Sequence, residues 1–382
     1  MGRAFLILED GTLFEGESLG APGRTAGEVV FNTGMTGYQE ILSDPSYAGQ
    51  IVALTYPIIG NYGINIDDFE SSRLQVSGMV VKETADIPSN WRSTMSLNAL
   101  LKERGITAIQ GVDTRALTRI LRSRGVMMGA ISTDETPKEA LDRLASSPRY
   151  DTEDLNRTVT TQNSYLWRVN SAFPELPGAS TQGARYRIAL LDCGVKYNIL
   201  RSLAALGCDT TVFPCTADAK ELLQMNPDGI ILSPGPGDPS NLGYVVNTVK
   251  QLIGKKPIMG VCLGTQILGC VFGSRTYKLK FGHRGSNHPV RDIKTGKVYI
   301  TSQNHGYAVD ADHLKDGMEV AQINLNDGTV EGLRHRDLPI ISIQYHPEAS
   351  PGPTDSAYFF KEFLSLIVSR EESCYESASQ IT

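Results

Sequence analysis

Four short apolar runs in the second half of this chain alternate with helix-like segments, and this alternation restricts the fold more than any other feature. The runs are "YRIALLDC", "DTTVFPC", "DGIILSPG" and "PIMGVCLG", and segments such as "KYNILRSLAALG" and "YVVNTVKQLIG" lie between them. Strands that are apolar at nearly every position are typical of a parallel sheet buried on both faces. We therefore predict a doubly wound, mostly parallel α/β sheet over residues 186–370.

The first 150 residues lack this regular alternation. "AFLILEDGTLFEG" predicts a β-hairpin around Asp10-Gly11, and "EVVFNT", "QIVALTYP" and "VSGMVVKE" predict further strands. Helices are expected from "TMSLNALLKERG", "TRALTRILRSRG" and "TPKEALDRLASS". A chain of 382 residues is too long for one ordinary core, so we predict a separate N-terminal α+β domain over residues 1–150.

Two segments have a different composition from these domains. Residues 151–185 are rich in Ser, Thr, Asn, Pro and Gly, which predicts an interdomain connection, ordered in part by Trp167 and Phe173. The last residues, 371–382, are polar, and we expect a frayed tail there.

Charge and cysteine content exclude several classes of protein. A net charge of −6 implies no large basic surface, so nucleic acid is not expected as a partner. No apolar stretch approaches the roughly 20 residues that span a bilayer, so no membrane segment is expected. The six cysteines form no C-x-x-C pair, which predicts reduced thiols, no metal site and a cytoplasmic location. An organelle stroma is the alternative location, if a transit peptide has been removed.

One cysteine stands in a setting typical of a nucleophile. Cys262 follows the strand-like "PIMGV" and precedes the helix-like "LGTQILGCVFG", with Gly260 and Gly264 on either side. This spacing copies the nucleophile elbow, in which glycines allow a strained strand-to-helix turn. The helix N-terminus would stabilise a thiolate. Most unpaired cysteines are packing residues, and we assign that role to Cys193, Cys208, Cys215 and Cys270, whereas Cys374 lies in the polar tail and is assigned no role.

The most suitable base for Cys262 is His346. It ends the strand-like run "PIISIQYHPE", and Glu348 is two residues further on, so both side chains can point the same way. A carboxylate so placed orients the imidazole and stabilises its charged form. The remaining histidines have weaker settings: 283, 288 and 305 are expected to form pocket walls or loop hydrogen bonds, and 313 and 335 to lie in solvent.

The loop "SPGPGDP" follows another predicted strand and predicts an oxyanion hole. The backbone N–H of Gly235, together with the N–H of Leu263 after the nucleophile, would hold a developing negative charge. A phosphate-binding loop is the alternative, although the chain has no G-x-x-x-x-G-K-[ST] pattern.

Together these motifs resemble the class I (triad-type) glutamine amidotransferases, through "GVCLGTQ", "SPGPGDP" and "HPE". Further stretches resemble the small, glutamine-hydrolysing subunits of carbamoyl phosphate synthases: "GEVVFNTGMTGYQEILSDPSYAGQIVALTYPIIGNYG", "DCGVKYNILR", "KFGHRGSNHPV", "SQNHGYAVD" and "HPEASPGP". The first of these stretches separates the carbamoyl phosphate synthase small subunits from other amidotransferases, because the other amidotransferases lack the N-terminal domain in which it lies. Two positions depart from the family pattern: Thr265 stands where histidine is usual, and Pro234 where asparagine is common.

The resemblance implies a role for each matching residue. Cys262 would be the nucleophile, His346 the base and Glu348 its partner. The residues implied to bind L-glutamine come from both domains: Ser46, Gly235, Gly237, Leu263, Gln266, Asn304, Gly306 and Tyr307.

The resemblance also implies the activity and the partner. Glutamine would be hydrolysed through a cysteinyl thioester, and the ammonia would pass to a large synthetase subunit in a heterodimer or a higher oligomer of heterodimers. That subunit would use bicarbonate, ATP and Mg to make carbamoyl phosphate for arginine and pyrimidine synthesis, so no cofactor is expected on this chain. The alternatives are an amidotransferase serving another synthetase, a non-catalytic scaffold of the same fold, and a thiol peptidase or hydrolase.

Overall fold

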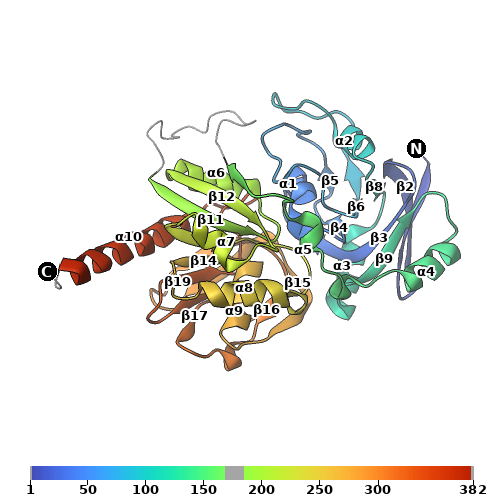
Figure 1. Ribbon diagram of the computed structural model, residues 1–382. Helices are drawn as coiled ribbons and strands as arrows, with labels where there is room; N and C mark the ends of the chain where they lie inside the picture. Colours follow the sequence, from blue (N-terminus) through green and yellow to red (C-terminus); the bar gives the residue numbers. More distant parts are fainter. Residues whose placement is uncertain (1, 168–184, 380–382) are drawn as a thin grey trace.

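The computed structural model describes residues 2–167 and 185–379, with side chains described through residue 370. Figure 1 shows two domains side by side, with the N-terminal half in blue to green and the C-terminal half in green to red. Each domain has its own buried apolar clusters, so each has its own core.

Strands of the N-terminal domain close into a barrel in the order β1-β2-β8-β6-β4-β3-β9. Their bounds are β1 Arg3–Leu8, β2 Leu13–Gly20, β3 Arg24–Asn32, β4 Gln50–Leu54, β6 Gly78–Val80, β8 Thr107–Gln110 and β9 Met127–Ser132. The predicted hairpin is confirmed, because β1 and β2 pair antiparallel across the Asp10-Gly11 turn. The closure was not predicted: β3, β4, β6 and β8 pair in parallel over long connections, which leave no local signal.

Short helices and a small sheet surround the barrel. They are α1 Tyr38–Ser43, η1 Pro45–Tyr47, α2 Leu97–Glu103, α3 Thr114–Arg124 and α4 Pro137–Ser146, with β5 Ile58–Ile59 paired to β7 Glu83–Thr84. The three predicted helices are confirmed. In α4 the side chain of Thr136 accepts from the N–H of Glu139, and the Glu139 carboxylate accepts from the N–H of Thr136. This reciprocal cap explains why the helix begins there.

The C-terminal domain is built on one sheet in the order β10-β12-β11-β13-β14-β19-β18-β17-β15-β16. Its strands are β10 Tyr165–Trp167, β11 Tyr186–Asp192, β12 Cys208–Pro214, β13 Gly229–Leu232, β14 Ile258–Val261, β15 Thr276–Asp292, β16 Val298–Val309, β17 Met318–Asn324, β18 Val330–His335 and β19 Ile340–Ile343. The run from β12 to β19 is parallel, and the strands outside it pair antiparallel. The predicted mostly parallel core is therefore confirmed.

Helices cover both faces of this sheet. On one face lie α7 Ala219–Gln224, α8 Gly243–Leu252 and α9 Leu263–Val271, and on the other α6 Tyr197–Ala205 and α10 Tyr358–Ser379. Strand β11 shows why its run is apolar throughout. Ile188 and Leu190 belong to the cluster with α6 and α10, whereas Ala189 and Leu191 belong to the opposite cluster.

The expected connection over residues 151–185 begins with ordered elements. Its start contains η2 Tyr150–Thr152 and α5 Asn156–Val159, and β10 adds an antiparallel edge to the C-terminal sheet. Phe173 lies outside the described residues. Helix α10 continues to Ser379, into the segment expected as a frayed tail. No helix in residues 2–167 and 185–379 combines the length and hydropathy needed to cross a membrane.

Candidate active site

Cys262 occupies a strained turn between β14 and α9. Its backbone has φ 53° and ψ −105°, a conformation that is rare for a residue with a side chain. A Cβ on Gly260 would lie 2.8 Å from backbone atoms of Gly264, and one on Gly264 would lie 2.4 Å from the carbonyl oxygen of Leu232. The predicted elbow is confirmed, and both glycines are required because backbone fills the space that a side chain would need.

His346 reaches Cys262 because their strands are neighbours. Val261 at the end of β14 pairs in parallel with Ile343 at the end of β19, and the N–H of Cys262 donates to the Ile343 carbonyl at 2.8 Å. His346 follows β19 and is held by its N–H, which donates to the carbonyl of Ser302 at 2.9 Å. Two residues separated by 84 positions therefore meet at one edge of the sheet.

His346 and Glu348 form a buried charged pair. Nδ1 of the imidazole lies 2.6 Å from Oε1 of the carboxylate. Burial lowers the pKa of His346, but the charge of Glu348 and the nearby Cys262 thiol raise it to about 10. Burial raises the pKa of Glu348, but the charges of Lys196 and His346 lower it to about 2. At neutral pH the pair is imidazolium and carboxylate.

The second imidazole nitrogen is available to the thiol. Within the described part of the chain, His346 Nε2 is buried and has no hydrogen-bond partner of normal geometry. The Cys262 side chain is nonetheless close enough to raise the pKa of His346. The thiol sulfur also lies 3.5 Å from Nε2 of Gln344 and 3.7 Å from the carbonyl of Asn304. His346 is therefore positioned to exchange a proton with the thiol.

A small pocket opens beside Cys262. All but one of the residues expected to bind glutamine line it: Ser46, Gly235, Gly237, Gln266, Asn304, Gly306 and Tyr307. Leu263 is not among the lining residues. Asn304 also joins the two domains, because its Nδ2 donates to Oδ2 of Asp44 at 2.9 Å, next to Ser46. The pocket therefore lies between the domains, as the mixed set of expected residues requires.

Four further lining residues were not singled out as binding residues: Gln50, Tyr150, Arg284 and His305. Several polar atoms of the wall are buried without a hydrogen-bond partner among the described residues, namely Ser46 Oγ, Gln50 Oε1, Arg284 Nε and Tyr307 Oη. Arg284 is 4% exposed, its Nη1 donates to the carbonyl of Phe281 at 2.8 Å, and it forms no ion pair within the described ranges. Buried polar atoms in folded proteins are almost always paired, so this wall is suited to a polar ligand. Arg284 lies in the stretch "KFGHRGSNHPV", which carried the family resemblance but has no local pattern that marks the arginine as a pocket residue.

The two residues of the expected oxyanion hole are neighbours: Gly235 lies in the loop after β13, and Leu263 is the first residue of α9. A Cβ on Gly235 would lie 2.7 Å from a side-chain carbon of Leu263 and 2.2 Å from the carbonyl of Cys193. Glycine is therefore necessary where the "SPGPGDP" loop passes the elbow. The N–H of Gly237 donates to the hydroxyl of Tyr150 at 2.9 Å, which fixes the far end of this loop.

Comparison with known proteins agrees with these features over almost the full chain. The glutamine amidotransferase class-I family matches residues 189–366, and the carbamoyl-phosphate synthase small chain CPSase domain matches residues 6–131. The carbamoyl phosphate synthase small chain of Akkermansia muciniphila is 51% identical over 96% of this chain and 97% of its own length. The chain belongs to the carbamoyl phosphate synthase small-chain family.

Other members of the family agree in length and identity. The small chain of Bacillus caldolyticus is 52% identical over 95% of this chain and 96% of its own length. The pyrimidine-specific small chain of Bacillus subtilis is 49% identical over 96% of each chain. The match to residues 6–131 argues against an amidotransferase of another synthetase, because it covers the domain that such proteins lack.

Thr265, one departure from the family pattern, has a structural role here. It is fully buried, and its hydroxyl donates to the carbonyl of Ile343 at 2.6 Å. The same carbonyl accepts the N–H of Cys262. Thr265 therefore ties the elbow helix to the strand that leads to His346.

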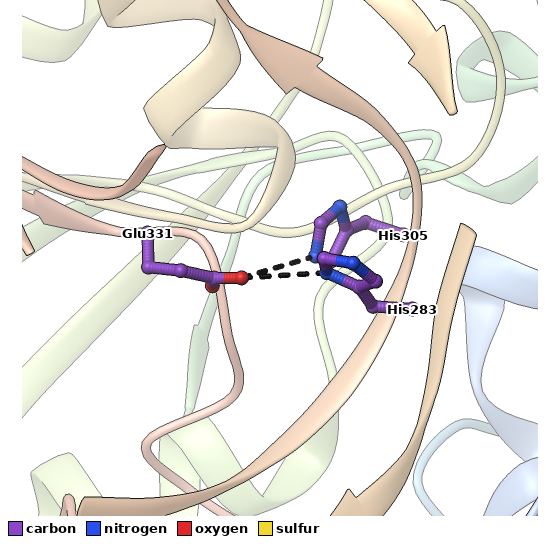
Figure 2. A group of neighbouring side chains, drawn as sticks. All are labelled: His283, His305 and Glu331. Carbon is purple, nitrogen blue, oxygen red and sulfur yellow. Dashed lines mark ion pairs between the residues drawn. The ribbon is translucent and has the colours of Figure 1, made fainter. Parts of the chain in front are cut away.

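A second buried group lies behind the pocket wall. Figure 2 shows His283 and His305 facing Glu331, with candidate ligand atoms all within 4.8 Å of one another. The side chains of His283, His305 and Glu331 already have hydrogen-bond partners within the protein. The Glu331 oxygens accept from Asn324 and Gln303, and the nitrogens of His305 lie 2.7 Å from Gln303 and 2.8 Å from the carbonyl of Tyr307. We interpret this group as a support for His305, which lines the pocket. The absence of a metal stays a prediction.

The remaining histidines divide between the surface and the interior. His313 is exposed and pairs with Asp310, as expected. The expectation that His335 lies in solvent is wrong. It is 8% exposed, and its Nδ1 accepts the N–H groups of Asp337 and Leu338 in the turn after β18. A histidine that caps a turn in this way leaves no pattern distinct from that of a surface residue.

Proposed function

We propose that this chain hydrolyses L-glutamine with Cys262 as the nucleophile, as the small subunit of carbamoyl phosphate synthase. The observation that carries this proposal is the arrangement of Cys262, on a strained elbow, beside the His346–Glu348 pair. The elbow also faces a pocket whose wall contains unpaired polar atoms. The family to which the chain belongs supports the same activity.

The reaction proceeds in two steps. The Cys262 sulfur attacks the side-chain carbonyl carbon of glutamine, and the tetrahedral intermediate collapses as His346 Nε2 gives its proton to the departing ammonia. The neutral imidazole then removes a proton from water, which attacks the thioester and releases glutamate with the regenerated thiol. Glu348 keeps the ring oriented in both steps. In our proposal the N–H groups of Gly235 and Leu263 hold the oxyanion, and one such donor contributes about 3 kcal/mol.

Arg284 is suited to the α-carboxylate of glutamine. A guanidinium that is buried and without an ion pair needs a negative charge, and a bound amino acid supplies one. Ser46, Gln50 and Tyr307 have unpaired oxygens on the same wall, which can bind the polar groups of the substrate.

The family implies a large synthetase subunit as the partner that receives the ammonia. In our proposal ATP and Mg bind to that subunit and not to this chain, and the complex acts in the cytoplasm. It is a heterodimer or a higher oligomer of heterodimers, which light scattering on the purified complex would distinguish.

The test uses the complex with its large subunit and two nitrogen donors. Cys262→Ala should abolish carbamoyl phosphate synthesis from glutamine and leave synthesis from ammonium unchanged. Cys208→Ala, at another buried cysteine in β12, is the matched control and should retain both activities. Equal loss with both donors in Cys262→Ala would mean that Cys262 is structural. Retained synthesis from glutamine would mean that another group is the nucleophile.

The scaffold and peptidase alternatives have separate outcomes. A wild-type complex that uses ammonium but not glutamine would be a non-catalytic scaffold. Cleavage of peptides by the chain without any partner would indicate a thiol peptidase. The proposal predicts neither.

A further inference from the structure

We propose that Glu70, in the N-terminal domain, is a positioning residue for the proposed catalytic triad of the C-terminal domain. This triad consists of Cys262, His346 and Glu348. Glu70 acts by fixing the start of α6, from which two side chains hold Glu348. This inference rests on the proposed glutaminase function and adds to the reaction a residue from the domain that lacks the nucleophile.

Glu70 caps a helix that belongs to the other domain. Its carbonyl accepts the N–H of Tyr197 at 2.9 Å, and its carboxylate Oε2 accepts the N–H of Asn198 at 2.9 Å. Its other oxygen pairs with the guanidinium of Arg201 at 3.2 Å. Helix α6 has no side-chain cap of its own, so these contacts supply the acceptors that its first turn needs.

The same helix start holds the triad carboxylate. Lys196 precedes α6, and its Nζ lies 3.0 Å from Oε1 of Glu348 and donates to the carbonyl of Ala349 at 2.7 Å. Asn198 Nδ2 donates to the carbonyl of Glu348 at 2.5 Å. Any movement of the first turn of α6 therefore moves the group that orients His346.

The charges of this group are buried and depend on one another. Glu70 is 1% exposed and Lys196 is 3% exposed. Burial lowers the pKa of Lys196, but the charges of Glu348 and Glu70 raise it above its ordinary value. Burial raises the pKa of Glu70 to about 7, although the positive charges of Lys196 and Arg201 oppose this shift. Removal of the Glu70 carboxylate would leave Arg201 without its ion-pair partner in α6, which favours rearrangement of that helix.

The contacts of the triad loop with the N-terminal domain agree with this link. A Cβ on Gly37 would lie 2.1 Å from the ring of Pro351, which follows Glu348 in the same loop. The N–H of Glu70 donates to Ser43, the residue before the Asp44 that bonds to Asn304. The N-terminal domain thus contacts both the glutamine wall and the triad loop through one short region.

The test compares Glu70→Gln with Glu135→Gln in the complex with the large subunit. Glu135 is a matched control: its side chain is 8% exposed, it pairs with Arg24 and Arg143, and it lies in the N-terminal domain away from the triad. For Glu70→Gln we expect the kcat of glutamine hydrolysis to fall about tenfold with KM within twofold, because the pocket wall is unchanged. Synthesis from ammonium should stay at the wild-type rate, and Glu135→Gln should retain both activities.

Each other outcome has a defined meaning. A kcat within twofold of wild type for Glu70→Gln, or an equal fall in Glu135→Gln, would overturn the positioning role. If Glu70→Gln does not fold, Glu70→Asp decides, because it keeps the charge but withdraws the acceptor from Asn198. We expect a threefold to fivefold fall in its kcat, and full activity would overturn the proposal. A wild-type complex inactive with glutamine would instead contradict the proposed function.

Discussion

His346 and Glu348 share a hydrogen bond of 2.6 Å in a place where neither side chain is more than 4% exposed. The pair is stable in this place because Lys196 contributes a second positive charge to the carboxylate at 3.0 Å. The imidazole is thus kept charged by its surroundings, with its free nitrogen toward the thiol.

Neutralising Glu348 should shift the pH dependence of the reaction. The pKa of His346 is raised from 6.5 to about 10, so the stability it contributes is complete below about pH 6.5 and is lost as pH rises through 10. Glu348→Gln removes the charge that raises this pKa, and the imidazolium should lose its proton at lower pH. We expect the alkaline limb of kcat/KM to move to lower pH and kcat to fall by up to about 10⁴-fold.

The control for this measurement is Glu319→Gln, which removes a carboxylate from an exposed pair with Arg336. Its pH–rate profile should match that of the wild type. An unshifted alkaline limb in Glu348→Gln would show that this carboxylate does not govern the imidazole.

Replacing Arg284 should weaken the binding of glutamine more than it slows the reaction. Arg284→Met removes the proposed partner of the α-carboxylate, and a hydrogen bond to a charged group is worth about 1.5–3 kcal/mol. The KM for glutamine should therefore rise roughly 10- to 100-fold, since about 1.4 kcal/mol is a factor of ten. Steady-state kinetics of ammonia release measure this effect.

A truncated substrate makes this result specific. The glutamine analogue that lacks the α-carboxylate should react equally poorly with the wild type and with Arg284→Met. Arg336→Met, at an exposed arginine, should leave both substrates unaffected. If Arg284→Met lost activity with the truncated analogue by the same factor as with glutamine, Arg284 would support the surrounding backbone and would not bind the α-carboxylate of the substrate.

Thr265 should contribute to stability through its single buried hydrogen bond. Thr265→Val removes a donor to Ile343, whose carbonyl keeps the N–H of Cys262, so we expect a loss of about 1 kcal/mol in the free energy of unfolding. Denaturant unfolding of the purified chain measures it. Thr118→Val, which removes a similar bond within α3, should cost less because that site is only partly buried. Equal costs in both variants would contradict the structural role assigned to Thr265.

Local patterns in the sequence were sufficient to propose Cys262 as the nucleophile and His346 and Glu348 as its partners. Cys262 stands between two glycines at a strand-to-helix boundary, and His346 precedes Glu348 by two residues at a strand end. Each of these signals depends on backbone geometry that spans only a few residues. Arg284 and Gln50 carry no such signal, because they become pocket residues only when two domains meet.

The amino-acid sequence by itself determined the parallel core, the elbow and the residues of the proposed triad, because periodicity and turn geometry are local properties of a chain. Only the tertiary structure decided that the N-terminal strands close into a barrel, that β14 and β19 are neighbours, and that Glu70 caps a helix of the other domain. These depend on contacts between residues far apart in sequence, which form when burial brings separate elements together and leave no repeat or spacing in the chain.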